Sequence, residues 1–257
     1  TFGAPQLRVA IVLFALGVGS ILVTQALDGQ QADLEALEAE AQALREEDAG
    51  LASERYEQLA LSSQILDEQV QYYIESATLA EQNGDLDRSE SLFNTALVSA
   101  DLNTELNTKV GLRFAQFLLS HSKPQEALQR LQALMGYQSL STFQRAKLIF
   151  YTEQSCEILG KDSDGELKDF YAAMNALPEV QADLHMALSD LRLQYGQSDK
   201  ALAELNKAAQ LVVSEGLALR LIESKARAHD RLGNLPEAIE AYEELRANRV
   251  PVAPIKT

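Results

Sequence analysis

The feature that most constrains the fold is a phrase of sequence that returns every 36 to 38 residues. In each copy an amphipathic helical pattern leads into a polar turn, and a second helical pattern begins near a small residue. The turns lie at Gly84, Ser122, Gly196 and Gly233, with a degenerate copy around Gly160. Self-similarity at this period is typical of helical solenoids, in which each helix pair covers the apolar face of its neighbour. About five helix-turn-helix repeats are therefore predicted.

The composition also favours an all-α chain. The 257 residues include 13 Gly, 6 Pro and no Trp, and they are rich in Ala, Leu, Glu and Gln, which are good helix formers. A hydrophobic content of 46% argues against general disorder, because the chain has enough apolar surface to form a core.

The last copy gives the clearest family resemblance. Residues 232–245 read Leu-Gly-Asn-Leu-Pro-Glu-Ala-Ile-Glu-Ala-Tyr-Glu-Glu-Leu, with Ala238 as the small residue that lets two helices close and Tyr242 filling the gap below. This stretch resembles the tetratricopeptide repeat (TPR) family, and the resemblance covers about residues 70–248. The chain departs from the family in having periods above the usual value of about 34 residues, in lacking the signature Trp, and in carrying Ser89 where a small Ala is usual.

The resemblance implies a binding surface rather than a catalytic site. In such arrays the first helices line a concave face that holds a peptide or helix of a partner protein. In the last repeat the groove positions of the family fall on Arg220, Glu223, Arg227, Asp230 and Arg231, which form the candidate partner-binding groove. A solvated surface is the alternative, because Glu223 and Arg227 have the i,i+4 spacing of an ordinary helix ion pair.

Residues 9–27 form an uncharged apolar stretch, about as long as a helix needs to cross a bilayer. The sequence therefore predicts one transmembrane helix there. Arg8 precedes the stretch and the next cation is Arg45, so the positive-inside rule predicts a short cytoplasmic N-terminus at residues 1–8 and places the repeats on the other side. A cleaved signal peptide is the alternative.

The predicted span also suggests a location and a contact. A single-pass protein of the bacterial inner (plasma) membrane, with its repeats in the periplasm, fits the predicted topology. Ala15 and Gly19 have the small-xxx-small spacing at which another membrane helix can approach closely.

Residues 28–69 read as an acidic helical stalk, short and similar to a coiled coil. Such a stalk could pair with a second copy and make a homo-oligomer, whereas the same apolar stripe could instead fold back on the repeats. Residues 28–90 hold 17 acidic and three basic residues, a net charge of −14, which excludes nucleic acid as a partner. The a and d positions of the stalk are Leu27, Leu34, Leu37, Ala41, Leu44 and Leu51.

The sequence contains no motif that indicates catalysis or the binding of a metal or cofactor. Nucleophile elbows, phosphate loops, dinucleotide fingerprints and metal-ligand spacings are absent from it. His121, His185 and His229 lie far apart and read as ordinary packed or solvated residues. Cys156 lies in an apolar helical pattern, which predicts a buried thiol. We therefore expect a non-enzyme with no catalytic residue, metal or cofactor, and residues 249–257, which contain two prolines, as a loose tail.

The predicted function is a non-catalytic, membrane-anchored TPR scaffold or adaptor that helps to assemble or stabilise a complex of the bacterial cell envelope. By resemblance, the candidate processes are pilus or secretion assembly, cytochrome maturation and translocon-associated chaperoning. The alternative is an organelle-membrane TPR receptor whose cytosolic repeats recognise targeting or chaperone segments. A third reading is an enzyme regulator held at the membrane.

Overall fold

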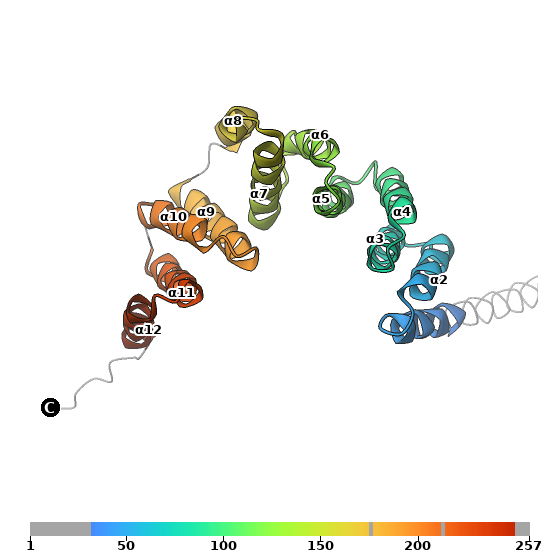
Figure 1. Cartoon of the computed structure of the whole chain (residues 1–257), viewed down its shortest axis with the longest axis horizontal. Helices are drawn as coiled ribbons and strands as arrows, with labels where there is room; N and C mark the ends of the chain where they lie inside the picture. Colours follow the sequence, from blue (N-terminus) through green and yellow to red (C-terminus); the bar gives the residue numbers. More distant parts are fainter. Residues whose placement is uncertain (1–31, 175–176, 212–213, 250–257) are drawn as a thin grey trace, which may run out of the picture. The chain divides into compact units, whose positions relative to one another are not determined.

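The computed structural model describes residues 32–174, 177–211 and 214–249, and within them the regular structure is helical without any β-strand (Figure 1). The described residues fall into two compact units, divided between Leu102 and Asn103. Unit 1 contains a helical stretch at 32–44, then α2 (Ala49–Ser62), α3 (Leu66–Gln82) and α4 (Leu86–Ser99). Unit 2 contains α5 (Thr104–Ser120), α6 (Pro124–Met135), α7 (Thr142–Leu159), α8 (Ser163–Met174), α9 (Pro178–Gln194), α10 (Ser198–Ala209), α11 (Glu215–Leu232) and α12 (Leu235–Arg249).

Five helix pairs occupy the described residues, and each pair turns at a residue with positive φ. The pairs are α3–α4, α5–α6, α7–α8, α9–α10 and α11–α12, each with a first helix of 17 or 18 residues and a second helix of 12 to 15. Glycine adopts the left-handed region without a Cβ clash, which explains its recurrence at four of the five turns. The φ values are 81° at Gly84, 59° at Ser122, 65° at Gly160, 72° at Gly196 and 76° at Gly233.

Polar side chains fix where several helices begin. Asp85 caps α4 by accepting a hydrogen bond from the Arg88 backbone N–H, and Asn103 caps α5 in the same way. Ser141 and Gln144 form a capping box at the start of α7. Such caps satisfy backbone donors that have no partner within the helix, so they make the start of each helix a property of the local sequence.

A small residue five positions after the turn lets the two helices of a pair approach closely. Ser89, Ala127, Ala201 and Ala238 occupy this position and are buried. The third pair differs, because α8 begins one residue later after its turn than the other second helices and exposes Gly165. Its buried residues are instead Leu167 and Phe170. The degenerate copy therefore keeps the helix pair but not the register of its second helix.

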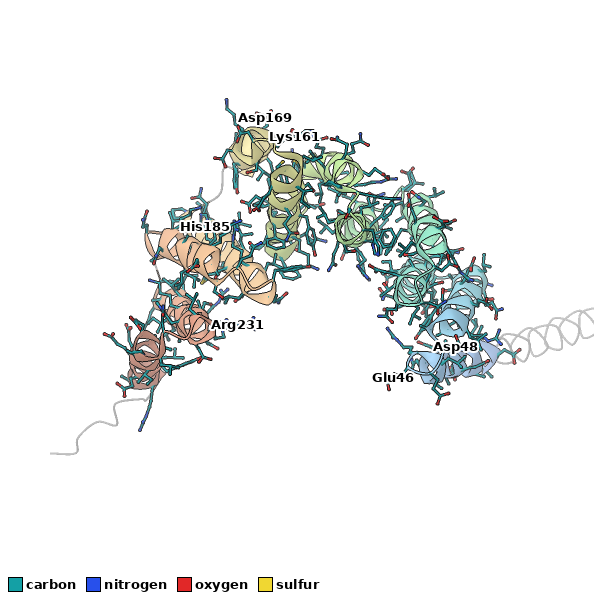
Figure 2. The ribbon with its side chains drawn as sticks, viewed as in Figure 1. Glu46, Asp48, Lys161, Asp169, His185 and Arg231 are labelled. Carbon is teal, nitrogen blue, oxygen red and sulfur yellow. The ribbon has the colours of Figure 1, made fainter. Side chains whose placement is uncertain are left out.

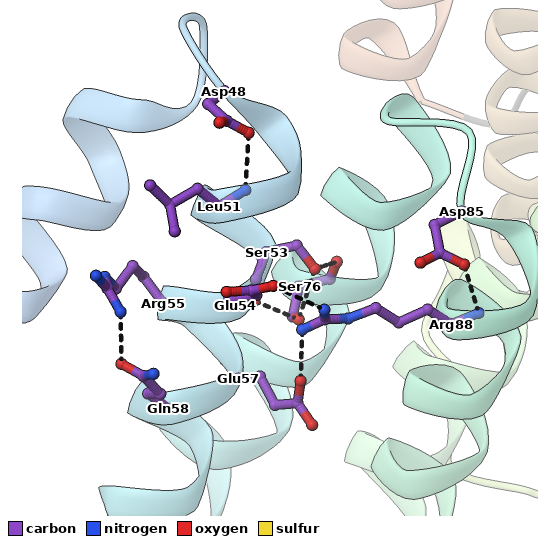
Figure 3. A network of polar contacts seen from close by, with 10 residues as sticks. All are labelled: Asp48, Leu51, Ser53, Glu54, Arg55, Glu57, Gln58, Ser76, Asp85 and Arg88. Atoms are coloured by element: carbon purple, nitrogen blue, oxygen red, sulfur yellow. Dashed lines mark hydrogen bonds and ion pairs between the residues drawn. The ribbon is translucent and has the colours of Figure 1, made fainter.

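Four residues of the apolar stripe predicted for a stalk, Leu34, Leu37, Ala41 and Leu44, pack in the core of unit 1, while Leu27 lies outside the described residues. The helical stretch 32–44 ends before Asp48, whose carboxylate accepts a hydrogen bond from the Leu51 N–H and starts α2 (Figure 3). The expectation of an extended stalk is therefore corrected, and these residues do not form a free seam for a second copy. The core joins Ala41, Ala52, Tyr56, Leu59 and Leu79, with Leu34, Leu37, Leu44, Ala49 and Tyr72 packed against it.

Two kinds of contact hold α2 to the first pair. The buried hydroxyls of Ser53 and Ser76 each donate to the other residue's backbone carbonyl, at 2.9 and 2.7 Å, which requires close approach of α2 and α3 (Figure 3). Arg88 on α4 donates to Glu57 at 2.6 Å and reaches Glu54 at 3.5 Å. The acidic residues near the N-terminal end of unit 1 are thus partly used in its own packing.

Unit 2 is built by stacking of successive pairs. In Figure 1 the first helices α5, α7, α9 and α11 follow the inner side of this unit and the second helices α6, α8, α10 and α12 the outer side. Helix α6 packs against α7, and α10 packs against α11, so each of these second helices also covers the next first helix. One apolar core in this unit contains Ala182, Met186, Leu193, Ala201, Leu205, Ala208, Leu217, Leu221 and Ala228.

A membrane-crossing helix is not found in residues 32–174, 177–211 and 214–249, where every helix is too short or too polar for one. This finding contradicts the predicted architecture of a transmembrane helix followed by a stalk, and it contradicts the predicted single-pass inner-membrane localisation. Both predictions are corrected. The stretch 9–27 itself, with Ala15 and Gly19, lies outside the described residues, as do residues 1–8 and 250–257. The domain boundaries drawn from the sequence stay predictions.

Candidate functional site

The first helices of unit 2 form a face with two neighbouring recesses. Helix α7 contributes to both recesses. Helices α9 and α11 contribute to one of them, and α5 contributes to the other together with Tyr195 and Gln197 of the turn that follows α9. One recess is lined mainly by charged residues and the other by amides, phenols and apolar side chains. We call this surface the first-helix face.

The charged recess has a volume of about 370 Å³ and brings together three of the five predicted groove residues. Arg220 pairs with Asp183 at 2.9 Å and Arg227 pairs with Asp190 at 3.4 Å, both across from α11 to α9. Each pair is separated by 37 residues, which is the length of one repeat, so the partners occupy the same position in adjacent pairs. Glu223, Ser224, Met186, Ala187, Thr142 and Phe143 complete the lining.

In this recess, burial and the neighbouring arginines shift the pKa of Asp190 in opposite directions. Burial raises the pKa of Asp190, while the guanidinium groups of Arg227 and Arg220 act to lower it, and the net effect is a raised pKa. Asp183 Oδ1 is buried and accepts no well-directed hydrogen bond in the described residues, even though Arg220 lies close to it. Since Arg220 Nη1 lies 2.9 Å from this oxygen, the contact is an ion pair rather than a well-directed hydrogen bond.

The other two predicted groove residues lie outside the recess. Arg231 reaches across to α9 and donates to the backbone carbonyl of Leu193 at 2.6 Å (Figure 2). This carbonyl, at the C-terminal end of α9, also accepts a hydrogen bond from the Gly196 N–H, so Arg231 is its second donor. Asp230 is exposed and does not line the recess. The structure therefore brings Arg220, Glu223 and Arg227 together and assigns a packing role to Arg231.

The second recess, of about 360 Å³, is nearly free of charge. Gln116 donates to the Tyr195 hydroxyl at 2.9 Å, and the hydroxyls of Tyr195 and Tyr151 lie 3.3 Å apart. Burial, followed by the hydrogen bond with Tyr195, raises the pKa of Tyr151, so this phenol stays neutral. The remaining lining residues are Leu119, Ser120, Gln154, Glu157, Ile158 and Gln197. Amides, neutral phenols and apolar surface together suit a peptide backbone with an apolar side chain.

A buried ionic cluster joins the third and fourth pairs. Arg192 of α9, 8% exposed, lies 2.7 Å from Glu153 of α7 and 3.7 Å from Glu204 of α10. Glu204 also contacts His185 Nδ1 at 2.7 Å and accepts a hydrogen bond from Lys207 at 3.0 Å (Figure 2). The cluster borders a cavity of about 360 Å³, which Thr142, Arg145, Asp164, Tyr171, Val180, Gln181 and Leu184 complete.

The pKa values of the two carboxylates in this cluster are shifted in opposite directions. Burial raises the pKa of Glu153, and the opposing charge of Arg192 does not cancel this effect. Burial also acts to raise the pKa of Glu204, but hydrogen bonds from His185 and Lys207 outweigh it and keep that pKa below its usual value. Each oxygen of Glu204 therefore has a partner, and the cluster works as a joint between α7, α9 and α10.

Sequence reasoning missed this cluster because its members come from three helices. His185 is separated from its carboxylate partner by 19 residues, and Arg192 from Glu153 by 39. One signal was present: Glu204 directly precedes Leu205 on the apolar side of α10, where a charged residue needs a buried partner. Within the described residues, no group of three or more His, Cys, Asp or Glu could hold a metal ion.

Comparison with known proteins gives distant structural likenesses only. No family model and no curated protein matches the chain. Among solved structures, BtubC (BKLC) from P. vanneervenii is 13% identical, with a TM-score of 0.42 over 100% of this chain and 97% of that one. Pseudomonas aeruginosa pilF is 14% identical, with a TM-score of 0.39 over 86% of this chain and 94% of that one. At these TM-scores neither likeness supports a family or a function.

Proposed function

We propose that this chain is a non-catalytic, TPR-like protein-binding module that holds an extended segment of a partner protein along the first-helix face of unit 2. The observation that carries the proposal is the pair of recesses on the first helices, both of which α7 lines. Repeat arrays bind partners on such faces because side chains of successive first helices recur at a fixed spacing. The proposal concerns the class of partner and not the identity of an assembly.

The lining residues define the partner segment. An apolar side chain fits between Ile158, Leu119 and Tyr195, while the surrounding glutamine amides can bond to its backbone. A residue with a hydrogen-bond donor fits beside Asp183, and a carboxylate fits beside Arg220, whose side chain is 62% exposed. Both signs of charge are therefore expected in the segment.

The spacing within the segment follows from α9. Ala187 of α9 lines the charged recess, and Tyr195, which directly follows α9, lines the uncharged recess; eight helical residues correspond to about 12 Å. An extended peptide covers that length with roughly four residues. We expect an apolar anchor and a charged residue at about that separation.

The absence of catalysis is part of the proposal. The strongest candidate acid–base groups, Glu204 and His185, bond to each other, and Lys207 occupies the second carboxylate oxygen. These bonds, with those of Arg192, give the cluster a structural role between α7, α9 and α10. The function is accordingly assigned to binding.

The test is selection of binding peptides from a random 12-residue phage library against the full chain. Ile158→Lys and Arg227→Glu, both at exposed positions, should each weaken the selected peptides at least tenfold, one in each recess. Lys168→Glu, on the exposed face of α8, is the matched control and should leave affinity unchanged. Selected peptides that ignore both substitutions, or no enrichment at all, would refute the proposal.

A further inference from the structure

The repeat itself shows which surface of a second helix receives the next helix pair. The sixth and ninth residues after the positive-φ turn are Leu128 and Leu131 on α6, and both are buried, at 1% and 0% exposure. On α10 the equivalent residues are Leu202, partly buried against the core, and Leu205, fully buried. They are covered because α6 packs against α7 and α10 packs against α11.

On α12 the same positions are open. Ile239 and Tyr242 are the sixth and ninth residues after Gly233, and they are 57% and 42% exposed. Leu235, 58% exposed, extends them into a stripe with the i, i+4, i+7 spacing of one helix face. Ala238 is buried on the side of α12 that packs against α11. Helix α12 thus has apolar residues on two sides, of which only one is covered within the described residues.

The charges beside the stripe indicate what covers it. Glu243 is exposed and lies beside the stripe on the side away from Ala238, four residues after Ile239, and the exposed Arg246 continues the stripe four residues after Tyr242. A helix that packs there meets the Glu243 carboxylate at one border and the Arg246 guanidinium at the end of the stripe, so a basic residue is favoured opposite Glu243 and an acidic residue opposite Arg246. Helix α11 of this chain is an example of a helix that covers such a stripe, because its Leu217, Leu221 and Ala228 lie in one apolar core with residues of α10.

We propose that α12 is a second binding surface, which takes an amphipathic helix of a partner protein. The apolar stripe of that helix covers Leu235, Ile239 and Tyr242, one of its lysine or arginine residues faces Glu243, and one of its aspartate or glutamate residues faces Arg246. The partner helix occupies the place that α7 takes on α6 and α11 takes on α10. This surface is independent of the first-helix face, because none of its residues lines either recess.

A labelled synthetic peptide with the sequence of α11, Glu215–Leu232, is the probe, since it carries the stripe that already covers α10. Fluorescence anisotropy with the full chain should show saturable binding. Ile239→Lys and Tyr242→Lys should each weaken it at least tenfold and leave the thermal midpoint unchanged, because both side chains are exposed. Val98→Lys, at an exposed apolar position of α4, is the matched control and should bind as the unmodified chain does.

Four results would overturn the proposal. Equal binding by Ile239→Lys and the unmodified chain would remove the stripe from the interaction. Loss of binding in Ile158→Lys would place the peptide on the first-helix face instead. A dimer in sedimentation that Ile239→Lys converts to a monomer would assign the stripe to a second copy of the chain. Displacement of the probe by a peptide of residues 250–257 would assign it to the chain's own last residues.

Discussion

Replacement of Arg192 by Met tests the ionic joint between the third and fourth helix pairs. The substitution keeps an unbranched side chain of similar length but removes the cation that lies between Glu153 and Glu204. Breaking a buried ion pair by removing one partner costs about 3 to 5 kcal/mol, because a charge is left without compensation. Since Glu153 keeps 27% of its side chain exposed, we expect a loss near the lower end, about 3 kcal/mol.

The stability lost in Arg192→Met should be smaller at low pH than at neutral pH. Burial raises the pKa of Glu153 above its unfolded value, so the folded chain takes up this proton at higher pH than the unfolded chain does. Acidification therefore favours the folded state at this position, and more so in Arg192→Met, where the charge that lowers this pKa is gone. Glu204, whose pKa is lowered, stays ionised in the same window. The penalty of Arg192→Met should be smaller at pH 5.5 than at pH 7.5, by roughly 1 kcal/mol, about one pKa unit.

The assay is urea unfolding of the full chain at 25 °C, followed by circular dichroism at 222 nm and by tyrosine fluorescence, since the chain has no Trp. Coincidence of the two transitions justifies a single free energy of unfolding for a repeat array. Arg220→Met is the control, because its ion pair is largely exposed and should contribute less than about 1 kcal/mol. A loss below about 1 kcal/mol in Arg192→Met, or an equal loss at both pH values, would refute the reasoning.

Three further predictions concern packing, turns and the thiol. Ala238→Trp should overpack the last helix pair and cost about 1 to 3 kcal/mol in urea unfolding, whereas Lys200→Ala should stay within about 0.5 kcal/mol; equal effects would mean that the repeat frame is wrong. Gly196→Ala, at φ 72° with open space around it, should lower the free energy of unfolding by about 1 kcal/mol, because alanine disfavours a positive φ. Gly136→Ala, at φ −73°, should be neutral or slightly stabilising. A loss of stability in Gly136→Ala alone would contradict this reasoning. Cys156 is fully buried and burial raises the pKa of its thiol, so a disulfide reagent should label it only when the chain unfolds, and rapid labelling of the native chain would contradict that placement.

The turns could be predicted from the sequence because their conformation is a local property. Glycine at Gly84, Gly196 and Gly233 is required by a positive φ, and the small residue that follows five positions later is required by close helix packing. The register of the second helix in the third pair could not be predicted from the sequence. Because the turn before α8 is one residue longer, this helix buries Leu167 and Phe170. No local sequence pattern indicates that the turn is longer.

The stripe at Leu34, Leu37 and Leu44 shows where a local pattern has two solutions. A heptad of leucines fits a coiled coil with a second chain and a helix packed on its own domain equally well, because both bury the same face. Asp48 decided between them. The preceding helix ends at residue 44 and the Asp48 carboxylate starts α2, so the stripe packs against α2 and α3.

The candidate site was predictable in part. Arg220, Glu223 and Arg227 follow from the family's groove positions, but their partners Asp183 and Asp190 were found only in the structure. The 37-residue offset of each pair equals the repeat period, so a search for opposite charges one period apart would have found them. The cluster around the Glu204 carboxylate depends on contacts between helices, and spacing within a helix cannot reveal it.

The central claim is that the first helices of unit 2 bind an extended partner segment, and amide hydrogen exchange of the full chain with a selected peptide tests it most directly. Binding slows exchange where it suppresses local opening. The predicted result is added protection in α5, α7, α9 and α11, around the recesses that Tyr195 and Arg227 line, with α6 and α10 unchanged. Protection confined to the second helices, or spread evenly over both units, would contradict the claim.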